Sequence, residues 1–132
     1  MKAVFADTFY YIALLNANDS SHETIVAATH ELKSKTVTTA WVLLELANAL
    51  SAQRHRETFA KFLNRLRENP NVIIYEADRE LFDLGVALYR DRSDKEWSLT
   101  DCISFQVMTR EGITEALTGD HHFTQAGFSI LF

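Results

Sequence analysis

Short apolar segments alternate with longer segments of helical periodicity along this chain of 132 residues. The short segments are rich in β-branched or aromatic residues, as buried strands are, and they are 3–6 (AVFA), 36–38 (TVT), 72–75 (VIIY), 115–118 (EALT) and 129–132 (SILF). The longer segments predict helices over 20–32, 40–53, 56–69, 78–90 and 98–111. A further helix is expected to begin near Thr8, after the first strand.

The alternation of strand and helix predicts an α/β fold in which helices cover both faces of a parallel sheet. One domain over residues 1–132 is expected, because a chain of this length hides roughly two-thirds of its extended surface on folding. In open sheets of this kind, ligands bind at the carboxyl ends of the strands. Residues that follow the strands are therefore the first candidates for function.

The composition limits the cellular compartment and the classes of ligand that we expect for this protein. Cys102 is the only cysteine, so the chain cannot form an internal disulfide, and a reducing compartment fits. The N-terminal MKAVFADTFYY lacks the pattern of a signal peptide, and no apolar run is long enough to cross a bilayer. We therefore expect a soluble cytoplasmic protein with no membrane partner. The net charge of −5, taken alone, argues against a polyanionic ligand.

Three acidic residues occupy positions that local structure could explain. Asp7 directly follows the first strand, where aspartate often caps a helix. Asp101 lies in SLTDCISF, a stretch with no other charge, and has capping-box spacing from Ser98. Asp120 follows the fourth strand and Gly119, as an ordinary turn aspartate would. Each local explanation is adequate for its own residue.

Glu45 is the only charged residue in TVTTAWVLLELANALSAQ, residues 36–53. A buried carboxylate without a partner is costly, so Glu45 reaches solvent, meets a distant arginine or serves a site. Four carboxylates at one rim of a sheet would repel one another unless a hard cation bound them, and Mg²⁺ or Mn²⁺ is the natural occupant. Calcium fits less well because the chain has no single ligand-rich loop. Zinc is disfavoured because the spacing of Cys102, His121 and His122 matches no usual zinc pattern, and the two histidines are expected to be exposed polar residues beside the site.

The sequence around these acids resembles the PIN domain, a family of metal-dependent ribonucleases. The motifs that carry the resemblance are FADT with Asp7, LLEL with Glu45, SLTDC with Asp101 and TGDHHF with Asp120. The resemblance extends from VFADT to HFTQAGF and is strongest to small stand-alone members, including VapC-like toxins. It implies a three-layer α/β/α sandwich with a mainly parallel central sheet. It also implies one or two Mg²⁺ or Mn²⁺ ions on the four acids and hydrolysis of RNA phosphodiester bonds.

The resemblance also implies supporting residues and partners. Thr8, Ser98 and Thr118 are expected to support the site, and hydroxyls such as those of Ser98 and Thr118 would hold a water or a metal ligand. Two positions depart from the family pattern. Phe9 replaces a small polar residue that many members carry, and Gly119 stands where a bulkier residue is frequent. The implied partners are an RNA substrate, a second copy of the chain in a homodimer and, if the protein is a toxin, a cognate antitoxin that plugs the acidic cleft.

A basic segment offers contacts for such a substrate. The stretch RHRETFAKFLNRLR, residues 54–67, carries five Arg or Lys residues against one acid. Arg54, Lys61 and Arg65 recur at helical spacing and are candidates for RNA contacts, although a solvated helix face explains the run as well. Two divalent ions would change the net charge from −5 to −1, which removes the objection to a polyanion.

Other functions fit the sequence less well. A phosphotransfer receiver needs a lysine near its last strands, and none follows Lys95. A cysteine hydrolase would need a lowered thiol pKa at Cys102, whereas the neighbouring Asp101 would raise it. A catalytically weak PIN-fold module that binds RNA or protein is the remaining alternative.

Overall fold

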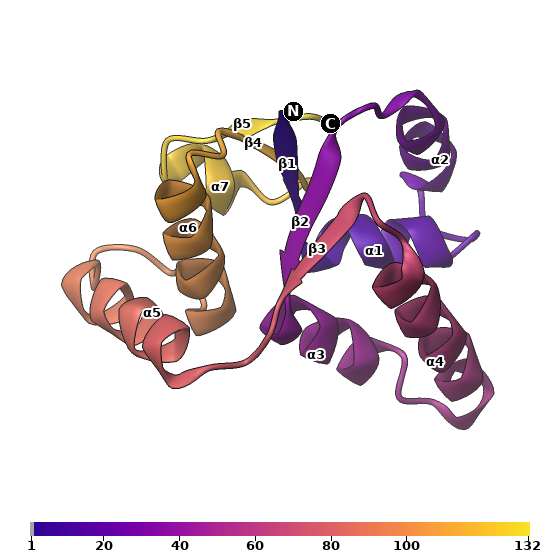
Figure 1. Ribbon diagram of the computed structural model, residues 1–132, viewed down its shortest axis with the longest axis horizontal. Coiled ribbons are helices and arrows are strands. Elements are labelled where there is room, and N and C mark those ends of the chain that lie inside the picture. The colour runs from indigo at the N-terminus through magenta and orange to yellow at the C-terminus, as the bar shows by residue number, and fades with distance from the viewer. Residues whose placement is uncertain (1) are drawn as a thin grey trace.

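The computed structural model describes residues 2–132 and contains a five-stranded sheet in which every strand pair is parallel (Figure 1). The strand order is β3-β2-β1-β4-β5, which places β1 at the centre. Phe5 of β1 aligns with Val37 on one side and with Ala116 on the other. The strands are β1 (Ala3–Ala6), β2 (Lys35–Thr39), β3 (Val72–Tyr75), β4 (Glu115–Leu117) and β5 (Ser129–Ile130).

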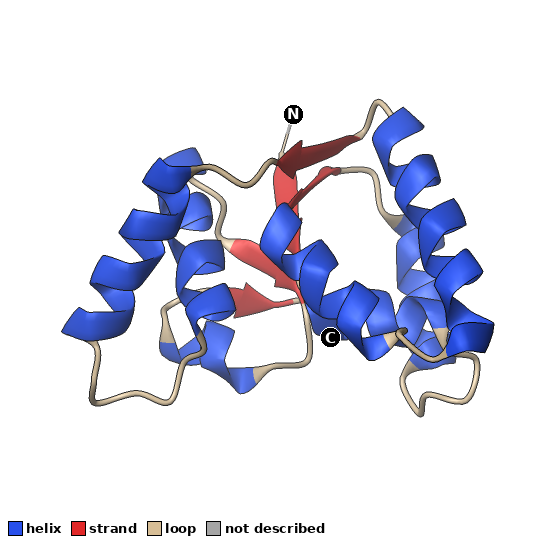
Figure 2. Ribbon diagram, turned by 90° about the horizontal axis from the view of Figure 1, so that it is seen from below, coloured by secondary structure: helices blue, strands red, loops and turns tan. Residues whose placement is uncertain are grey.

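Helices lie on both sides of this sheet, which confirms the expected α/β/α arrangement (Figures 1 and 2). In Figure 1, α1, α2 and α4 lie on one side and α5, α6 and α7 on the other, while α3 crosses beyond the carboxyl ends of the strands. The helices are α1 (Thr8–Leu15), α2 (His22–Glu31), α3 (Ala40–Ala49), α4 (Gln53–Glu68), α5 (Arg79–Asp91), α6 (Leu99–Glu111) and α7 (His121–Gln125).

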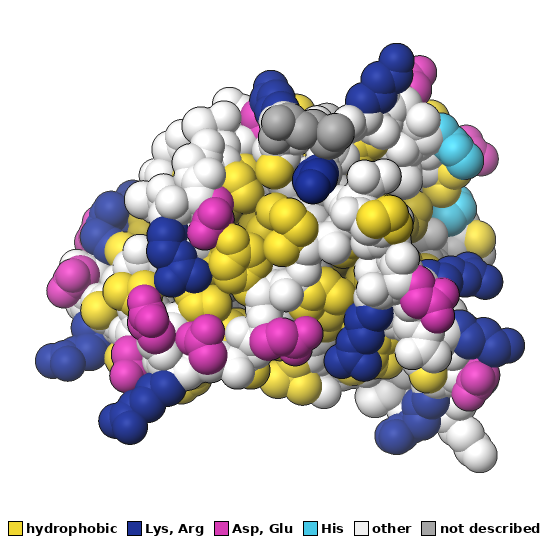
Figure 3. All heavy atoms as spheres, in the orientation of Figure 1, with side chains coloured by type: hydrophobic (Ala, Val, Ile, Leu, Met, Phe, Trp, Pro, Cys, Tyr) yellow, Lys and Arg dark blue, Asp and Glu magenta, His cyan; other side chains and the backbone are white. Residues whose placement is uncertain are grey.

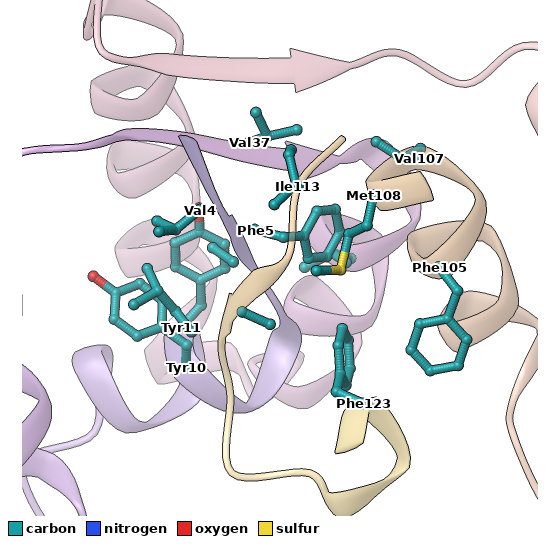
Figure 4. Close-up of a cluster of buried hydrophobic side chains, with 14 of the residues drawn as sticks. Val4, Phe5, Tyr10, Tyr11, Val37, Phe105, Val107, Met108, Ile113 and Phe123 are labelled. Atoms are coloured by element: carbon teal, nitrogen blue, oxygen red, sulfur yellow. The ribbon is translucent and has the colours of Figure 1, made fainter. Parts of the chain in front are cut away.

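The hydrophobic core fills the space between the sheet and these helices (Figure 4). Phe5 points toward Met108 of α6, and its ring centroid lies 6.3 Å from that of Phe123. On the other face, Tyr10 and Tyr11 of α1 pack near Val4. Apolar burial on both faces is typical of a parallel sheet, and it explains the continuous apolar sequence of the central strand β1.

Helix α6 is buried on most of its surface, which explains the near absence of charge in SLTDCISF. Helix α5 packs against the outer side of α6, and the two helices approach each other closely at Gly85. A Cβ at Gly85 of α5 would overlap the side chain of Ile103 of α6, so a glycine is needed there. The only carboxylate in the SLTDCISF stretch, Asp101, therefore lies at the first turn of a core helix.

The structure differs from the sequence-based prediction at the boundary of two helices and at short elements. Helix α3 ends at Ala49 where residue 53 was expected, and α4 begins at Gln53 where residue 56 was expected. Helix α7 was not predicted, because its five residues are too few to show a helical period. The last strand is two residues long, where residues 129–132 were expected to be extended. The other predicted strands agree with the structure to within one residue at either end.

Candidate active site

The four predicted acids line one cleft of about 590 Å³ at the carboxyl edge of the sheet. Each comes from a different part of the fold. Asp7 follows β1, Glu45 lies within α3, Asp101 is in the first turn of α6, and Asp120 precedes α7. Parallel strands end at the same edge of the sheet. Asp7 and Asp120, which are 113 positions apart in the sequence, therefore meet in this cleft.

Asp7 is the most deeply buried of the four, with 5% of its surface exposed. It occupies the N-cap position of α1, but its side chain makes no capping hydrogen bond. The carboxylate instead accepts a 2.9 Å hydrogen bond from the hydroxyl of Thr118. Burial raises the pKa of Asp7 to about 7, and the negative charges of Asp101 and Asp120 add to the increase. Asp7 therefore occupies the predicted N-cap position, but its carboxylate contacts Thr118 and forms no side-chain cap.

Glu45 is half-buried in the middle of α3 and connects that helix to α1. The hydroxyl of Thr8 donates a 2.6 Å hydrogen bond to its Oε1. None of the ion pairs formed by residues 2–132 includes Glu45, so the structure does not support a distant arginine as its partner. Its carboxylate is directed to the cleft by a neutral hydroxyl, which leaves the negative charge uncompensated.

Asp101 closes a capping box and also lies in the cleft. Its backbone N–H donates to Ser98 Oγ at 3.0 Å, and its Oδ2 accepts from the backbone N–H of Ser98 at 3.3 Å, which completes a capping box. The same carboxylate lines the cleft with 7% of the residue exposed. Burial raises the pKa of Asp101, and the charge of Asp120 raises it further.

Asp120 caps α7 by accepting a 2.9 Å hydrogen bond from the backbone N–H of His122. Its own backbone N–H donates to Thr118 Oγ1 at 3.0 Å. Since the Thr118 hydroxyl also donates to Asp7, this fully buried side chain holds Asp7 and Asp120 in a fixed relation. The local role expected for Asp120 is present, and the residue still lies in the cleft.

Two further polar residues line the cleft: Glu96, which the sequence reasoning missed, and His122, which it placed beside the site without these contacts. His122 was expected to be exposed, but its Nδ1 lies 3.3 Å from Asp101 Oδ2 and 3.3 Å from Asp120 Oδ1. The other member of the pair, His121, is exposed as expected, with 75% of its side chain accessible. Their positions in the sequence could have indicated that both residues lie near the site. His122 follows the fourth acid by two residues, and Glu96 precedes Ser98 by two.

Oxygen ligands dominate this cleft. Besides the four acids it is lined by Glu96, and within residues 2–132 its lining includes neither Lys nor Arg. One ligand atom each from Asp120, His121 and His122 lies within 4.8 Å of the others, so an imidazole is also within reach. Cys102 is buried, and burial together with the charge of Asp101 raises its thiol pKa to about 11, which makes it a poor nucleophile.

The basic residues predicted to contact RNA lie elsewhere. Arg54, Lys61 and Arg65 are exposed on α4, where Figure 3 shows Lys and Arg side chains along the lower right of the molecule. None of the three lines the cleft. Arg65 instead borders a separate cavity with Tyr10 and Asn69. Their contact with RNA stays a prediction.

A comparison with protein families identifies the family to which this fold belongs. The model of the PIN domain matches residues 4–129, a range that includes all four acids of the cleft. The chain belongs to the PIN domain family. The PIN domain resemblance expected from the four acidic motifs is thereby confirmed. No helix among residues 2–132 is long and apolar enough to cross a membrane.

Individual PIN relatives extend this comparison. The 23S rRNA-specific endonuclease VapC20 of Mycobacterium tuberculosis is 32% identical over 126 residues, which is 95% of either chain. The crystal structure of VapC20 from the same organism, described as a Sarcin-Ricin loop cleaving toxin, superposes with a TM-score of 0.84 at 28% identity over 95% of each chain.

Two more distant structures share the fold. The FitAcB structure from Neisseria gonorrhoeae has a TM-score of 0.70 at 17% identity and covers 98% of this chain and 96% of its own. VapBC2 from Rickettsia felis, bound to a DNA fragment from their promoter, has a TM-score of 0.67 at 12% identity and covers 97% and 96%. At these identities the likeness concerns the PIN fold alone.

Proposed function

We propose that the protein is a metal-dependent endoribonuclease that hydrolyses RNA phosphodiester bonds, and that it acts as the toxin of a toxin–antitoxin pair. The observation that supports this most directly is the convergence of Asp7, Glu45, Asp101 and Asp120 in one cleft. The relationship to VapC20, an rRNA endonuclease, supports the same class of reaction. The proposed partners are an RNA substrate, a cognate antitoxin and a second copy of the chain.

The donor set fits a hard divalent cation. Carboxylate oxygens are the ligands that Mg²⁺ and Mn²⁺ prefer, and the described lining of the cleft contains no Lys or Arg side chain that would neutralise them. Asp7, Glu45, Asp101 and Asp120 would hold the ion. When bound, it supplies Lewis-acid chemistry, which favours a water nucleophile and stabilises charge on the departing oxygen.

The surrounding side chains keep these carboxylates in place. Thr118 orients Asp7, Thr8 orients Glu45, and Ser98 fixes Asp101 through the capping box. The Nδ1 atom of His122 is within reach of both Asp101 and Asp120, where it can hold a proton. Since the thiol of Cys102 is buried, water is the proposed nucleophile.

The proposed function predicts cleavage of RNA that depends on a divalent cation. The purified protein should cut oligonucleotides from a panel of single-stranded RNAs and stem-loops, including a Sarcin-Ricin loop RNA, in Mn²⁺ or Mg²⁺. EDTA should stop the reaction, because the four carboxylates alone cannot lower the barrier to attack on a phosphodiester anion. Binding of the panel without cleavage in either metal would instead support the alternative, a catalytically weak PIN-fold module.

Metal binding should stabilise the protein, and more so at higher pH. The raised pKa of Asp7 means that the apo fold retains a proton that the unfolded chain has lost above about pH 4. The Asp7 contribution to apo stability is therefore complete below its ordinary pKa of 3.8 and falls until the pH passes about 7. Because Mn²⁺ displaces this proton, its effect on the melting temperature should be larger at about pH 8 than at about pH 6.

The variant Asp7→Asn isolates this effect. In EDTA, the melting temperature of the parent relative to Asp7→Asn should fall as the pH rises toward about 7 and then level off. The variant should also lose most of the stabilisation by Mn²⁺, whereas Asp91→Asn, a change at an exposed acid outside the cleft, should retain it. A melting temperature that saturating Mn²⁺ leaves unchanged would contradict the metal site.

A further inference from the structure

Phe9 is an exposed aromatic side chain at the edge of the acidic cleft. It lies in the first turn of α1, two residues after Asp7, and 39% of its surface is accessible. Its ring lines the same cleft as Glu45 and Asp101. The aromatic pairs formed among residues 2–132 do not include Phe9, so both the position and the exposure of its ring need a reason.

Gly119 provides the space for this ring. A Cβ on Gly119 would lie 2.5 Å from Cζ, 2.6 Å from Cε1 and 3.1 Å from Cε2 of Phe9. Real Cβ atoms do not approach other atoms as closely as the first two distances, so any other residue at 119 would displace the ring. The backbone of Gly119 does not have a positive φ, so its conformation does not require glycine.

Phe9 and Gly119 are therefore one structural feature. The ring of Phe9 occupies the space that a side chain at residue 119 would take. Thr118 and Asp120 flank Gly119, so the ring lies against the segment that carries two residues of the site. The ring thus lies between helix α1 and this segment, and its accessible part lines the cleft beside the carboxylates.

The chemistry of the cleft limits what this face can bind. An RNA strand that places a phosphate among five carboxylates meets repulsion, and no Lys or Arg of the described lining offsets it. A base carries no charge and has a π face, and stacking on an aromatic side chain is the common way in which proteins hold unpaired bases. An aromatic ring can therefore add affinity for RNA at this edge without filling the place of a metal ion.

We propose that Phe9, seated on Gly119, is a stacking platform for an unpaired base next to the phosphate that enters the acidic cleft. The proposal rests on the proposed ribonuclease function and adds to it a residue that selects single-stranded or looped RNA. Phe9 is a substrate-binding residue and takes no part in bond cleavage.

The experiment measures RNA binding in the Asp101→Asn background, which the proposed function makes inactive, so the RNA stays intact. The probe is a panel of single-stranded RNA oligonucleotides with 2-aminopurine at successive positions. The fluorescence of 2-aminopurine should fall in one RNA of the panel when the protein with Phe9 binds, because the modified base then stacks on the phenylalanine ring. Phe9→Leu keeps an apolar side chain without a π face, and it should weaken binding roughly tenfold and abolish the quenching.

Matched variants separate stacking from general effects. Phe82→Leu makes the same change at an exposed phenylalanine of α5, 42% accessible and outside the cleft, and should leave binding unchanged. Gly119→Ala should weaken binding as Phe9→Leu does, but should have little effect when Phe9 is replaced by serine, because the steric conflict is then gone. With Asp101 intact, the stabilisation of Phe9→Leu by Mn²⁺ should equal that of the parent.

Equal RNA affinities of the Phe9 and Phe9→Leu proteins, including no measurable binding by either, would overturn the proposal and leave the ring as a contact for a protein partner. Quenching that persists in Phe9→Leu would overturn it as well. Neither result bears on the nuclease itself. Cleavage of the panel by the Asp101→Asn background would instead count against the proposed function.

Discussion

Asp101→Asn is expected to abolish RNA cleavage and to leave the protein well folded. Asparagine has nearly the same shape, and its amide oxygen can still accept the hydrogen bond from the backbone N–H of Ser98. The capping box therefore survives in large part, and even complete loss of a cap costs only about 1 kcal/mol. Removal of the charge that holds a cation, however, should lower the rate of cleavage by orders of magnitude.

Melting in EDTA tests the structural half of this prediction. Because burial and the charge of Asp120 raise the pKa of Asp101, its carboxylate is a destabilising charge in the apo fold. The melting temperature of Asp101→Asn in EDTA at neutral pH should therefore equal or exceed that of the parent. Asp91→Asn is the matched control, since the same change at an exposed acid of α5 should leave cleavage unaffected. Cleavage by Asp101→Asn at the parental rate would reduce Asp101 to a helix cap.

The four acids could be predicted from the sequence mainly because the order of strands and helices determines which residues lie at the carboxyl edge of the sheet. A parallel sheet brings the residues after its strands to one edge, and this places Asp7 and Asp120 without any knowledge of side-chain conformations. Glu45 was detectable because it is the only charge in an apolar helix. The unusual composition around Asp101 likewise reflects a helix whose remaining residues are core.

Contacts between side chains from distant segments could not be predicted in this way. The sequence shows Phe9 and Gly119 as two separate departures from a family pattern, and only the packing shows that one makes room for the other. The hydrogen bond from Thr118 to Asp7 joins residues 111 positions apart and decides that Asp7 faces the cleft instead of capping α1. His122 was misjudged for a similar reason, because α7 turns one of two adjacent histidines inward.

Glu45→Gln is expected to remove both cleavage and stabilisation by Mn²⁺ while the apo fold stays intact. The glutamine oxygen can accept the same hydrogen bond from Thr8, so the connection between α1 and α3 is kept. The lost charge lies in a cleft with four other acids, so its removal should leave the melting temperature in EDTA unchanged or slightly higher. Glu57→Gln, on the exposed surface of α4, is the matched control and should retain cleavage.

Thr8→Val distinguishes the charge of Glu45 from its hydrogen bond. Valine is similar in shape to threonine but cannot donate to Oε1, so the carboxylate stays negative and loses only the 2.6 Å contact that orients it. Cleavage by Thr8→Val should therefore fall less than cleavage by Glu45→Gln, and stabilisation by Mn²⁺ should be reduced but present. If Glu45→Gln unfolds in EDTA, or if Thr8→Val loses as much activity as Glu45→Gln, then Glu45 serves chiefly to join α1 to α3. The cation would then be held by the three aspartates, because they are the other carboxylates that both the sequence motifs and the cleft assign to the site.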